Sequence, residues 1–206
     1  MGAEAGAREA LVRAGRRLAD RDLIVAAEGN LSVRLGGDLF LTTPAGREKG
    51  SLGLGDLVVV DLEGNPRGGR LRPSSEWRLH REIYRRRPDV GAVCHAHPPH
   101  ALAFACARRP LPALMPEAVM VLEGEVPVAP YAAPGTDAVA ESVRELIARR
   151  PCLLLANHGA VTTGRDMEQA LHRMETLERV AQTALLADRL GGGVVLTAAE
   201  VRELRG

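Results

Sequence analysis

Apolar residues recur along much of the chain at every third or fourth position, the period of a helix with one buried face. The clearest case is the segment 4–21, where Ala7, Leu11, Ala14 and Leu18 are separated by charged residues. The same pattern predicts further helices at 99–108, 136–149 and 166–190. The last of these is the longest and carries a continuous apolar stripe.

One more helix is predicted just after Pro73, because serine is a favoured capping residue at helix N-termini. Either Ser74 or Ser75 would cap this helix, and Leu79 and Ile83 would form its buried stripe. The helix ends in a run of arginines, which suit the negative end of a helix dipole. We interpret that run as a helix end and not as a binding patch.

Short apolar runs bounded by glycine or proline predict strands between these helices. We expect strands within the segments 26–33, 39–42, 57–62, 91–94, 126–131 and 152–156. The short run 194–196 is either another strand or a tail. Because strands alternate with helices but some strands are consecutive, the pattern predicts an α/β fold whose mixed sheet is covered on both faces.

The composition adds limits to this picture. With 206 residues, a single domain spanning 1–206 is expected. Only 2% of residues are aromatic, so Leu, Val, Ile and Ala must form the core. The net charge of +1 and the lack of a long apolar run argue against nucleic-acid or membrane partners. No signal-peptide pattern opens the chain, and Cys94, Cys106 and Cys152 are scattered, so we expect a cytoplasmic protein with buried free thiols.

Covalent catalysis through an imine is not favoured by the sequence. Lys49 is the only lysine, and it lies in the polar segment 47–50. A lysine that forms a Schiff base needs a desolvated pocket that lowers its pKa. We therefore expect Lys49 to be badly placed for such chemistry.

Histidines at the ends of two predicted strands indicate a metal site. His95 and His97 follow the apolar run 91–94 and are separated by one residue, so in a strand both side chains leave the same face. His158 follows the apolar run 152–156 and precedes a glycine. Three histidines with an open fourth position are a common zinc donor set in enzymes.

A carboxylate is expected near this site. Glu76 begins a helix shortly before His95, and it could serve as a fourth ligand or as a general base. The alternative is a ligand pair of Glu76 and His80, which lie one turn apart. We rank that pair lower, because His80 stands between arginines on what the sequence indicates is a polar helix face. The direction of His100 is undetermined, and His172 is expected to be a surface or helix-packing residue.

A second group of residues suits an anion such as phosphate. Backbone N–H groups at glycine turns and helix N-termini bind phosphate oxygens, although simple turn chemistry and capping would give the same pattern. The candidate residues are Gly29, Asn30, Ala45, Gly46, Ser74 and Ser75. Neither of the usual nucleotide-binding glycine motifs is present, so a nucleotide is not indicated.

Five motifs together resemble the class II aldolase/adducin family over roughly residues 5–190. They are Gly29-Asn-Leu-Ser-Val-Arg34, Thr43-Pro-Ala-Gly46, Pro73-Ser-Ser-Glu76, His95-Ala-His97 and Asn157-His-Gly159. Within the family, the sequence is most similar to the aldolases that act on L-fuculose 1-phosphate. The resemblance implies a three-layer α/β/α fold and a homotetramer with its sites between subunits.

The resemblance also implies a chemistry. Zinc, or another divalent metal, would be held by His95, His97, His158 and Glu76, and Glu76 would swing away to act as the base. The residues Gly29, Asn30, Ala45, Gly46, Ser74 and Ser75 would hold the phosphate of a ketose 1-phosphate. Retro-aldol cleavage of such a sugar, for example L-fuculose 1-phosphate, would give dihydroxyacetone phosphate and an aldehyde.

Three departures from the family pattern concern the substrate. Where the aldolase carries an acid tyrosine from the neighbouring subunit, this chain has Glu117, allowing a one-residue shift. The aldolase also closes its site with an aromatic C-terminal tail, whereas no aromatic residue follows Tyr131 in this chain. At the phosphate site, Ala27 and Ala45 stand where the family pattern has polar residues. Glu117 keeps open a dehydratase of the methylthioribulose-phosphate type or a 4-epimerase on the same scaffold. A non-enzymatic module like the adducin head is a third alternative, but it would not need the metal ligands.

Overall fold

The computed structural model describes residues 2–205, and its centre is a mixed sheet of eight strands in the order β4-β3-β2-β1-β5-β8-β7-β6. The strands are β1 Asn30–Gly36, β2 Leu39–Thr42, β3 Val58–Asp61, β4 Pro66–Gly68, β5 Ala92–Ala96, β6 Val128–Ala129, β7 Cys152–Leu155 and β8 Gly159–Gly164. Only the pairing of β6 with β7 is parallel; the other pairs are antiparallel.

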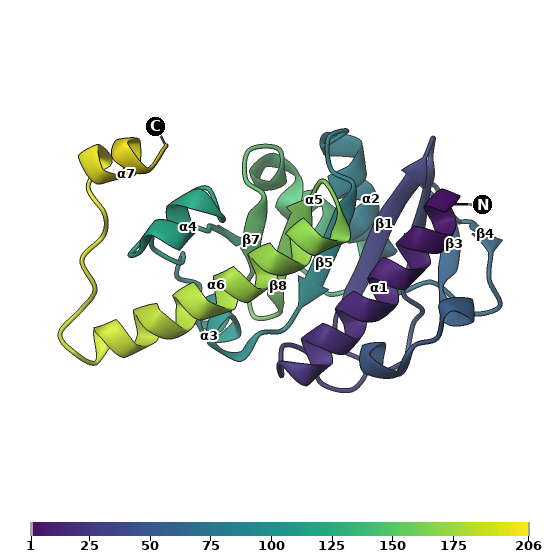
Figure 1. Ribbon diagram of the computed structural model, residues 1–206, viewed down its shortest axis with the longest axis horizontal. Coiled ribbons are helices and arrows are strands. Elements are labelled where there is room, and N and C mark those ends of the chain that lie inside the picture. The colour runs from purple at the N-terminus through teal and green to yellow at the C-terminus, as the bar shows by residue number, and fades with distance from the viewer. Residues whose placement is uncertain (1, 206) are drawn as a thin grey trace.

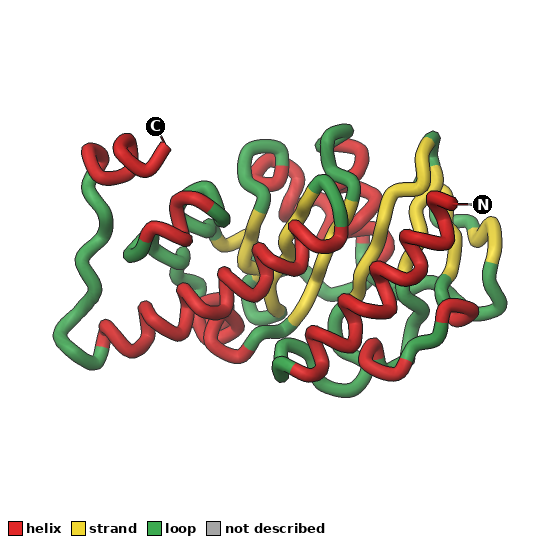
Figure 2. Tube along the Cα trace, viewed as in Figure 1, coloured by secondary structure: helices red, strands yellow, loops and turns green. Residues whose placement is uncertain are grey.

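Helices cover both faces of this sheet. Figure 1 shows α1 (Gly2–Asp20) and α6 (Met167–Asp188) lying across the near face, and α2 (Trp77–Arg86) and α5 (Asp137–Ile147) lying behind. The helix α3 (Pro99–Ala107) packs with α6. Figure 2 shows the strands enclosed between the two helical layers. The predicted three-layer α/β/α fold is therefore confirmed.

Two hydrophobic clusters fill the spaces between the layers. One joins α1, α3 and α6 to the sheet, and the other joins α2 and α5 to its opposite face. Side chains alternate between them along each strand, so Leu31 and Cys94 belong to the first cluster while Val93 belongs to the second. By the same alternation, Ser32 and His95 lie on the face that α2 covers. This arrangement places polar residues of β1 and β5 beneath α2.

Several elements differ from the sequence prediction. The strand β8 was not predicted, because its apolar run is short and is followed at once by a helix start. The strand expected at 126–131 shrinks to two residues, since Pro127 and Pro130 bracket it and proline has no N–H for the ladder. The helix α2 begins only at Trp77, with Glu76 and not a serine at the N-cap position.

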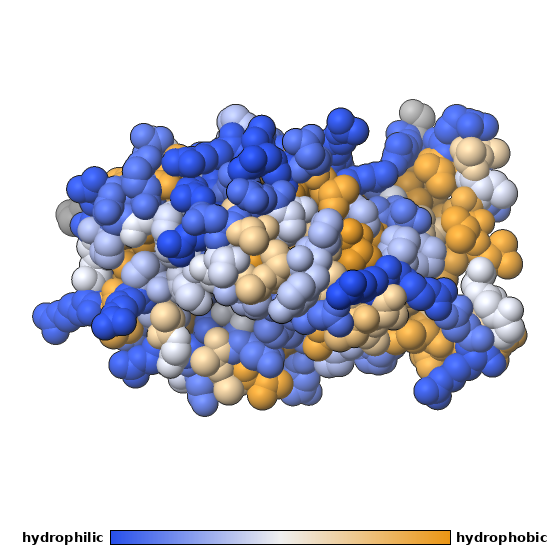
Figure 3. Space-filling model, turned by 180° about the vertical axis from the view of Figure 1, so that it is seen from behind, coloured by the Kyte–Doolittle hydropathy of each residue, from blue (hydrophilic) through white to orange (hydrophobic). Residues whose placement is uncertain are grey.

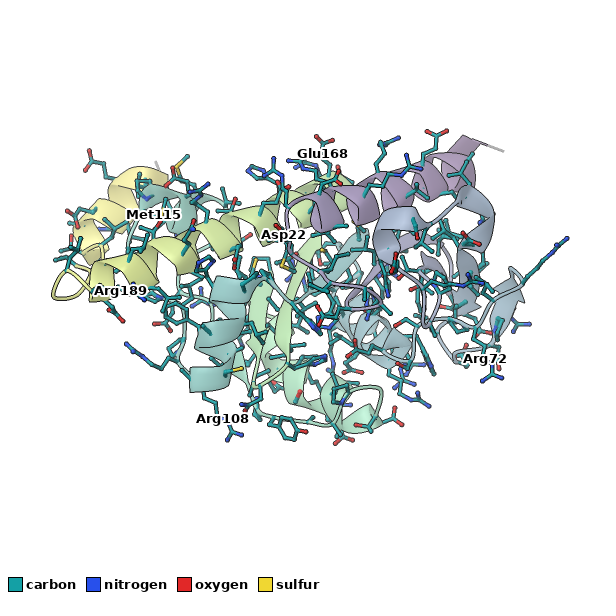
Figure 4. The ribbon with its side chains drawn as sticks, turned by 90° about the horizontal axis from the view of Figure 1, so that it is seen from below. Asp22, Arg72, Arg108, Met115, Glu168 and Arg189 are labelled. Carbon is teal, nitrogen blue, oxygen red and sulfur yellow. The ribbon has the colours of Figure 1, made fainter. Side chains whose placement is uncertain are left out.

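The C-terminal part also differs. The segment 194–196 is a tail, and the unpredicted helices α4 (Pro116–Met120) and α7 (Ala198–Arg205) pack against each other at one end of the molecule. Figure 4 shows Met115, which precedes α4, close to α7. Cys94 and Cys152 are buried as expected, but Cys106 is exposed on α3, so its predicted burial was wrong.

Viewed from behind, the molecule presents mainly hydrophilic residues, and its apolar residues gather most densely toward the end that carries α7 (Figure 3). Within residues 2–205, no helix has the length and apolar character that a membrane crossing requires.

Candidate metal centre

His95, His97 and His158 converge on one point at the end of the central strands. Their ring centroids form a triangle with sides of 5.0, 4.7 and 5.1 Å. The Nε2 atoms of His95 and His97 are 3.2 Å apart. One ring nitrogen from each of the three histidines lies within 4.8 Å of the other two, so the group could hold a metal ion.

The backbone explains this convergence. His95 lies in β5 and His97 follows the end of that strand, while His158 lies in the tight turn between β7 and β8. Asn157 in this turn adopts a left-handed conformation, with φ of 55°. Because β8 pairs with β5, the turn is held beside the two other histidines.

Gly159 is required at this junction because there is no space for a side chain. A Cβ atom there would lie 2.6 Å from the carbonyl oxygen of Ala96 and 2.6 Å from Cδ2 of His97. Both distances are shorter than real Cβ contacts allow. The glycine that follows His158 therefore lets the turn approach the His95 strand closely.

Glu76 lies beside two of the three histidines. Its Oε2 lies 3.2 Å from Nε2 of His95, and its Oε1 lies 3.3 Å from Nε2 of His158. Oε2 also accepts a hydrogen bond of 2.8 Å from the Asn30 side chain. Oε1 is buried and has no hydrogen-bond partner within the described part of the chain. An orphaned carboxylate oxygen beside three imidazole nitrogens fits a divalent ion such as zinc.

The electrostatics favour metal binding. Burial alone would raise the pKa of Glu76, but His95, His158 and the Asn30 amide outweigh burial and lower that pKa. Burial and the proximity of His95 lower the pKa of His158 to about 4, and the same two causes lower the pKa of His97. Both rings are therefore neutral at neutral pH and offer lone pairs. Burial disfavours the charged form of His95, yet the neighbouring Glu76 carboxylate outweighs burial and raises the pKa of His95 overall.

Groups outside the cluster orient the rings. Nδ1 of His95 donates to the carbonyl oxygen of Ala160 at 2.9 Å, which leaves Nε2 for the metal. Nδ1 of His97 lies 3.6 Å from Oε2 of Glu28, which also accepts a hydrogen bond from the backbone of Val25. Sequence reasoning missed Glu28, although it directly precedes the Gly29-Asn30 motif.

The three segments expected to hold an anion lie together. The backbone of Thr43 bonds to Leu31 next to the first segment, and the backbone of Ser74 bonds to Thr43. The N–H groups of Ala45 and Ser74 donate hydrogen bonds to the carbonyl oxygens of Arg72 and Thr43, respectively. These two N–H groups were expected to be free for an anion, and they are not. Figure 4 shows Arg72 toward the end of the molecule that carries β3 and β4.

The remaining candidates in this region are Gly46 and Ser75. Gly46 has a φ of 65°, and within residues 2–205 neither its N–H nor that of Ser75 has a hydrogen-bond partner. Gly29 also has a φ of 65°, and a Cβ there would lie 2.6 Å from the carbonyl oxygen of His95. Gly29 thus allows two backbone segments to approach closely, and its part in phosphate binding stays a prediction.

Other candidate residues lie apart from the cluster. Glu117 is exposed on α4, and no hydrogen bond or ion pair of its carboxylate occurs in the described residues. His100 pairs with Glu178, with 2.7 Å between Nδ1 and Oε1, and His172 is exposed. His80 is fully buried and bonds to Asn30 and Ser32, so its expected place on a polar helix face was wrong.

The expected environment of Lys49 was also wrong. Its side chain is 2% exposed, burial lowers its pKa, and its amine donates to the carbonyl oxygen of Ala27. The backbone of Lys49 packs closely against α1, since a Cβ at Gly15 would lie 2.4 Å from the backbone oxygen of Lys49. The amine thus contacts the loop that leads into β1.

Comparison with known proteins places this geometry in a family. The family model "Class II Aldolase and Adducin N-terminal domain" matches residues 9–185. The chain belongs to the class II aldolase and adducin family. It is 38% identical over 181 residues to a 5-methylthioribulose-1-phosphate/5-deoxyribulose-1-phosphate aldolase of Rhodospirillum rubrum, covering 88% of this chain and 81% of that one.

Two other similarities extend over nearly the full length. A 3-oxo-tetronate 4-phosphate decarboxylase of Haemophilus influenzae is 36% identical over 204 residues, covering 96% of this chain and 95% of that one. The solved structure of an L-fuculose 1-phosphate aldolase superposes with a TM-score of 0.91 at 34% identity, covering 97% of this chain and 94% of that one. These similar members of the family thus have names that differ in substrate.

We predict that Gly159→Ala weakens zinc binding by about 10-fold or more, the usual scale for disturbing groups that orient metal ligands. The added methyl group must push His97 or the Ala96 backbone away. Zinc affinity is measured by competition with a chromogenic chelator. Gly55→Ala is the matched control, because a Cβ there meets nothing within 4 Å. Equal zinc affinity in the two variants would contradict the geometry described.

Proposed function

We propose that the protein is a zinc-dependent aldolase that cleaves a ketose 1-phosphate into dihydroxyacetone phosphate and an aldehyde. The observation that carries this proposal is the orphaned Oε1 of Glu76 beside His95, His97 and His158. Two of the relatives compared are named as aldolases of ketose 1-phosphates, which supports the substrate class. The expected cytoplasmic location stays a prediction.

The reaction needs charge stabilisation and two proton transfers. A bound divalent ion would supply Lewis-acid stabilisation of the negative charge that develops on the substrate oxygens. When the C3–C4 bond breaks, the electron pair stays on C3, and the C4 hydroxyl group loses its proton as the aldehyde forms. Protonation of C3 then completes dihydroxyacetone phosphate.

We propose that Glu76 delivers the proton to C3. In the resting site Asn30 holds Oε2 and Oε1 faces the histidine cluster, and the carboxylate would leave this position to carry the proton once substrate binds. A positioned acid or base of this kind contributes about 10²–10⁴-fold to the rate. At the other end of the substrate, Gly46, Ser74 and Ser75 would hold the phosphate, with fewer side-chain donors than the family pattern supplies.

We propose that Glu117 of a neighbouring subunit in a homotetramer accepts the proton of the C4 hydroxyl group. This carboxylate is exposed and forms no hydrogen bond or ion pair within residues 2–205, which supports a role across an interface. The assignment follows from the position of Glu117 in the family pattern.

Subunit mixing tests this assignment. We predict that Glu76→Gln and Glu117→Gln proteins are each nearly inactive, and that refolding them together restores activity. Activity returns because some sites in the mixed oligomer combine the wild-type Glu76 of one subunit with the wild-type Glu117 of another. Each variant refolded alone is the control. A mixed oligomer without recovered activity, or a monomeric protein, would contradict the shared site.

Decarboxylation is a second candidate function. The relative from Haemophilus influenzae aligns over nearly the whole of both chains, and its name specifies a ketone phosphate with a carboxyl group. A 3-oxo acid that loses carbon dioxide leaves a carbanion next to the ketone, and proton delivery to that carbon gives dihydroxyacetone phosphate. The same Glu76 would therefore serve either reaction.

We predict that the zinc-loaded protein releases dihydroxyacetone phosphate from L-fuculose 1-phosphate or 5-deoxyribulose 1-phosphate, and that a chelator abolishes the release. Glu76→Gln should lower kcat by about 10²–10⁴-fold. Glu141→Gln, at an exposed position of α5, is the control and should retain activity.

The alternatives give different products. Carbon dioxide release from 3-oxo-tetronate 4-phosphate, without cleavage of the ketoses, would favour the decarboxylase. Turnover of a ketose phosphate without carbon–carbon cleavage would favour the dehydratase or the epimerase. Full cleavage by Glu76→Gln would contradict the role proposed for Glu76.

A further inference from the structure

A chain of buried polar side chains leads from the core to Glu76. Tyr84 and His80 of α2 meet Ser32 and Asn30 of β1, and all four are at most 3% exposed. The Ser32 hydroxyl lies 2.7 Å from the Tyr84 hydroxyl and 2.6 Å from Nδ1 of His80. Nε2 of His80 bonds to Oδ1 of Asn30, whose Nδ2 donates to Glu76.

Chemistry allows only one direction for the hydrogen bonds along this chain. A carboxylate only accepts, so the amide nitrogen of Asn30 must face Glu76. The amide oxygen of Asn30 then faces His80, which must donate from Nε2. Nδ1 of a neutral His80 must in turn accept the Ser32 proton, and Ser32 accepts the Tyr84 proton. Every donor in the chain points toward the Glu76 carboxylate.

The neutral state of His80 follows from its surroundings. Complete burial, with a smaller contribution from His95, lowers the pKa of His80 to about 3, and Glu76 only partly offsets these effects. A neutral imidazole has one donor and one acceptor nitrogen, which is what Asn30 and Ser32 require. The tautomer is thereby fixed by its two partners.

We propose that His80, with Ser32 behind it, is a positioning residue that holds the Asn30 amide so that it anchors Oε2 of Glu76 and leaves Oε1 for the metal. The proposal rests on the metal-ligand role of Glu76 in the proposed function. It changes the role expected for Asn30, because both ends of that amide are committed within the protein. The Asn30 side chain thus serves the carboxylate and not the phosphate.

The register of the sheet supports this assignment independently. Asn30 of β1 lies directly opposite His95 of β5. The anchor of Glu76 and a metal-site histidine therefore stand on adjacent strands, on the face that α2 covers. Glu76 and His80 are one helical turn apart, so both reach that face. The helix holds the carboxylate while the sheet holds its anchor.

Zinc affinity in a set of variants tests the proposal without relying on catalysis. His80→Leu removes the donor to Asn30, and we expect zinc affinity to fall by about 10-fold, as for other partners of metal ligands. His80→Gln should restore most of the affinity, because its amide can donate to Asn30 and accept from Ser32. Ser32→Ala should also lower zinc affinity, and it replaces His80→Leu as the test if the leucine variant does not fold.

Two controls separate positioning from general damage. Thr162→Val removes another fully buried hydrogen bond, to the carbonyl oxygen of Ala170, and should leave zinc affinity unchanged. In a Glu76→Ala background, His80→Leu should cause no further loss, because the carboxylate that it positions is gone. Chelator competition gives the affinity, and thermal unfolding confirms that each variant is folded.

Three results would overturn the proposal: unchanged affinity in His80→Leu, an equal loss in the Glu76→Ala background, or no rescue by glutamine. The cleavage assay is scored separately. If no tested substrate is cleaved but the zinc affinities of the His80 and Glu76 variants change as described, the proposed function fails and the positioning role stands. If cleavage depends on zinc and Glu76 but His80→Leu changes zinc affinity equally with and without Glu76, only the positioning role fails.

Discussion

The antiparallel pairing of β5 with both of its neighbours is the constraint on which the site depends. On one side it sets His95 opposite Asn30 of β1, and on the other it sets His95 opposite Val161 of β8. The first pairing brings the amide that holds Glu76 next to a histidine of the candidate metal centre. The second brings the turn carrying His158 within reach, provided that Gly159 has no side chain. A one-residue slip would turn His95 to the other face of the sheet.

The same constraint explains how so many polar groups are buried together. An unpaired buried polar atom is costly, and every side chain of the network that runs from Tyr84 to Asn30 has a hydrogen-bond partner. Glu76 lies at the end of this network, and its Oε1, which faces the three imidazoles, has no hydrogen-bond partner in the described residues. A fully satisfied network around one unsatisfied carboxylate oxygen is the arrangement expected where a cation completes the site. Structure and chemistry therefore support the same role for Glu76.

The sequence predicted the layers of the fold well, because the two hydrophobic periods are clear in the long helices and the buried strands. It also predicted that His95, His97 and His158 come together, since each stands at a strand end. It missed β8, whose run between two glycines becomes a strand only through pairing with β5 and β7. It placed His80 and Lys49 in polar surroundings, because neighbouring charges in sequence do not reveal a burial that other segments impose.

Residues whose partners belong to other elements were hardest to predict. Ser32 resembles an ordinary strand residue until α2 packs over it, and the Asn30 amide has no visible direction until Glu76 and His80 are placed. The family pattern assigned Asn30 to phosphate, whereas the contacts of its amide point to the carboxylate. Local patterns thus identified the chemical groups of the site, and tertiary contacts determined their roles.

X-ray absorption at the zinc edge of the zinc-loaded protein tests the central claim most directly. We predict one ion per chain with three imidazole nitrogens and one carboxylate oxygen at about 2.0–2.2 Å. In Glu76→Ala, the carboxylate contribution should be replaced by that of water while the three imidazoles remain. A spectrum with fewer than three imidazoles, or one unchanged by the loss of Glu76, would contradict the metal centre described.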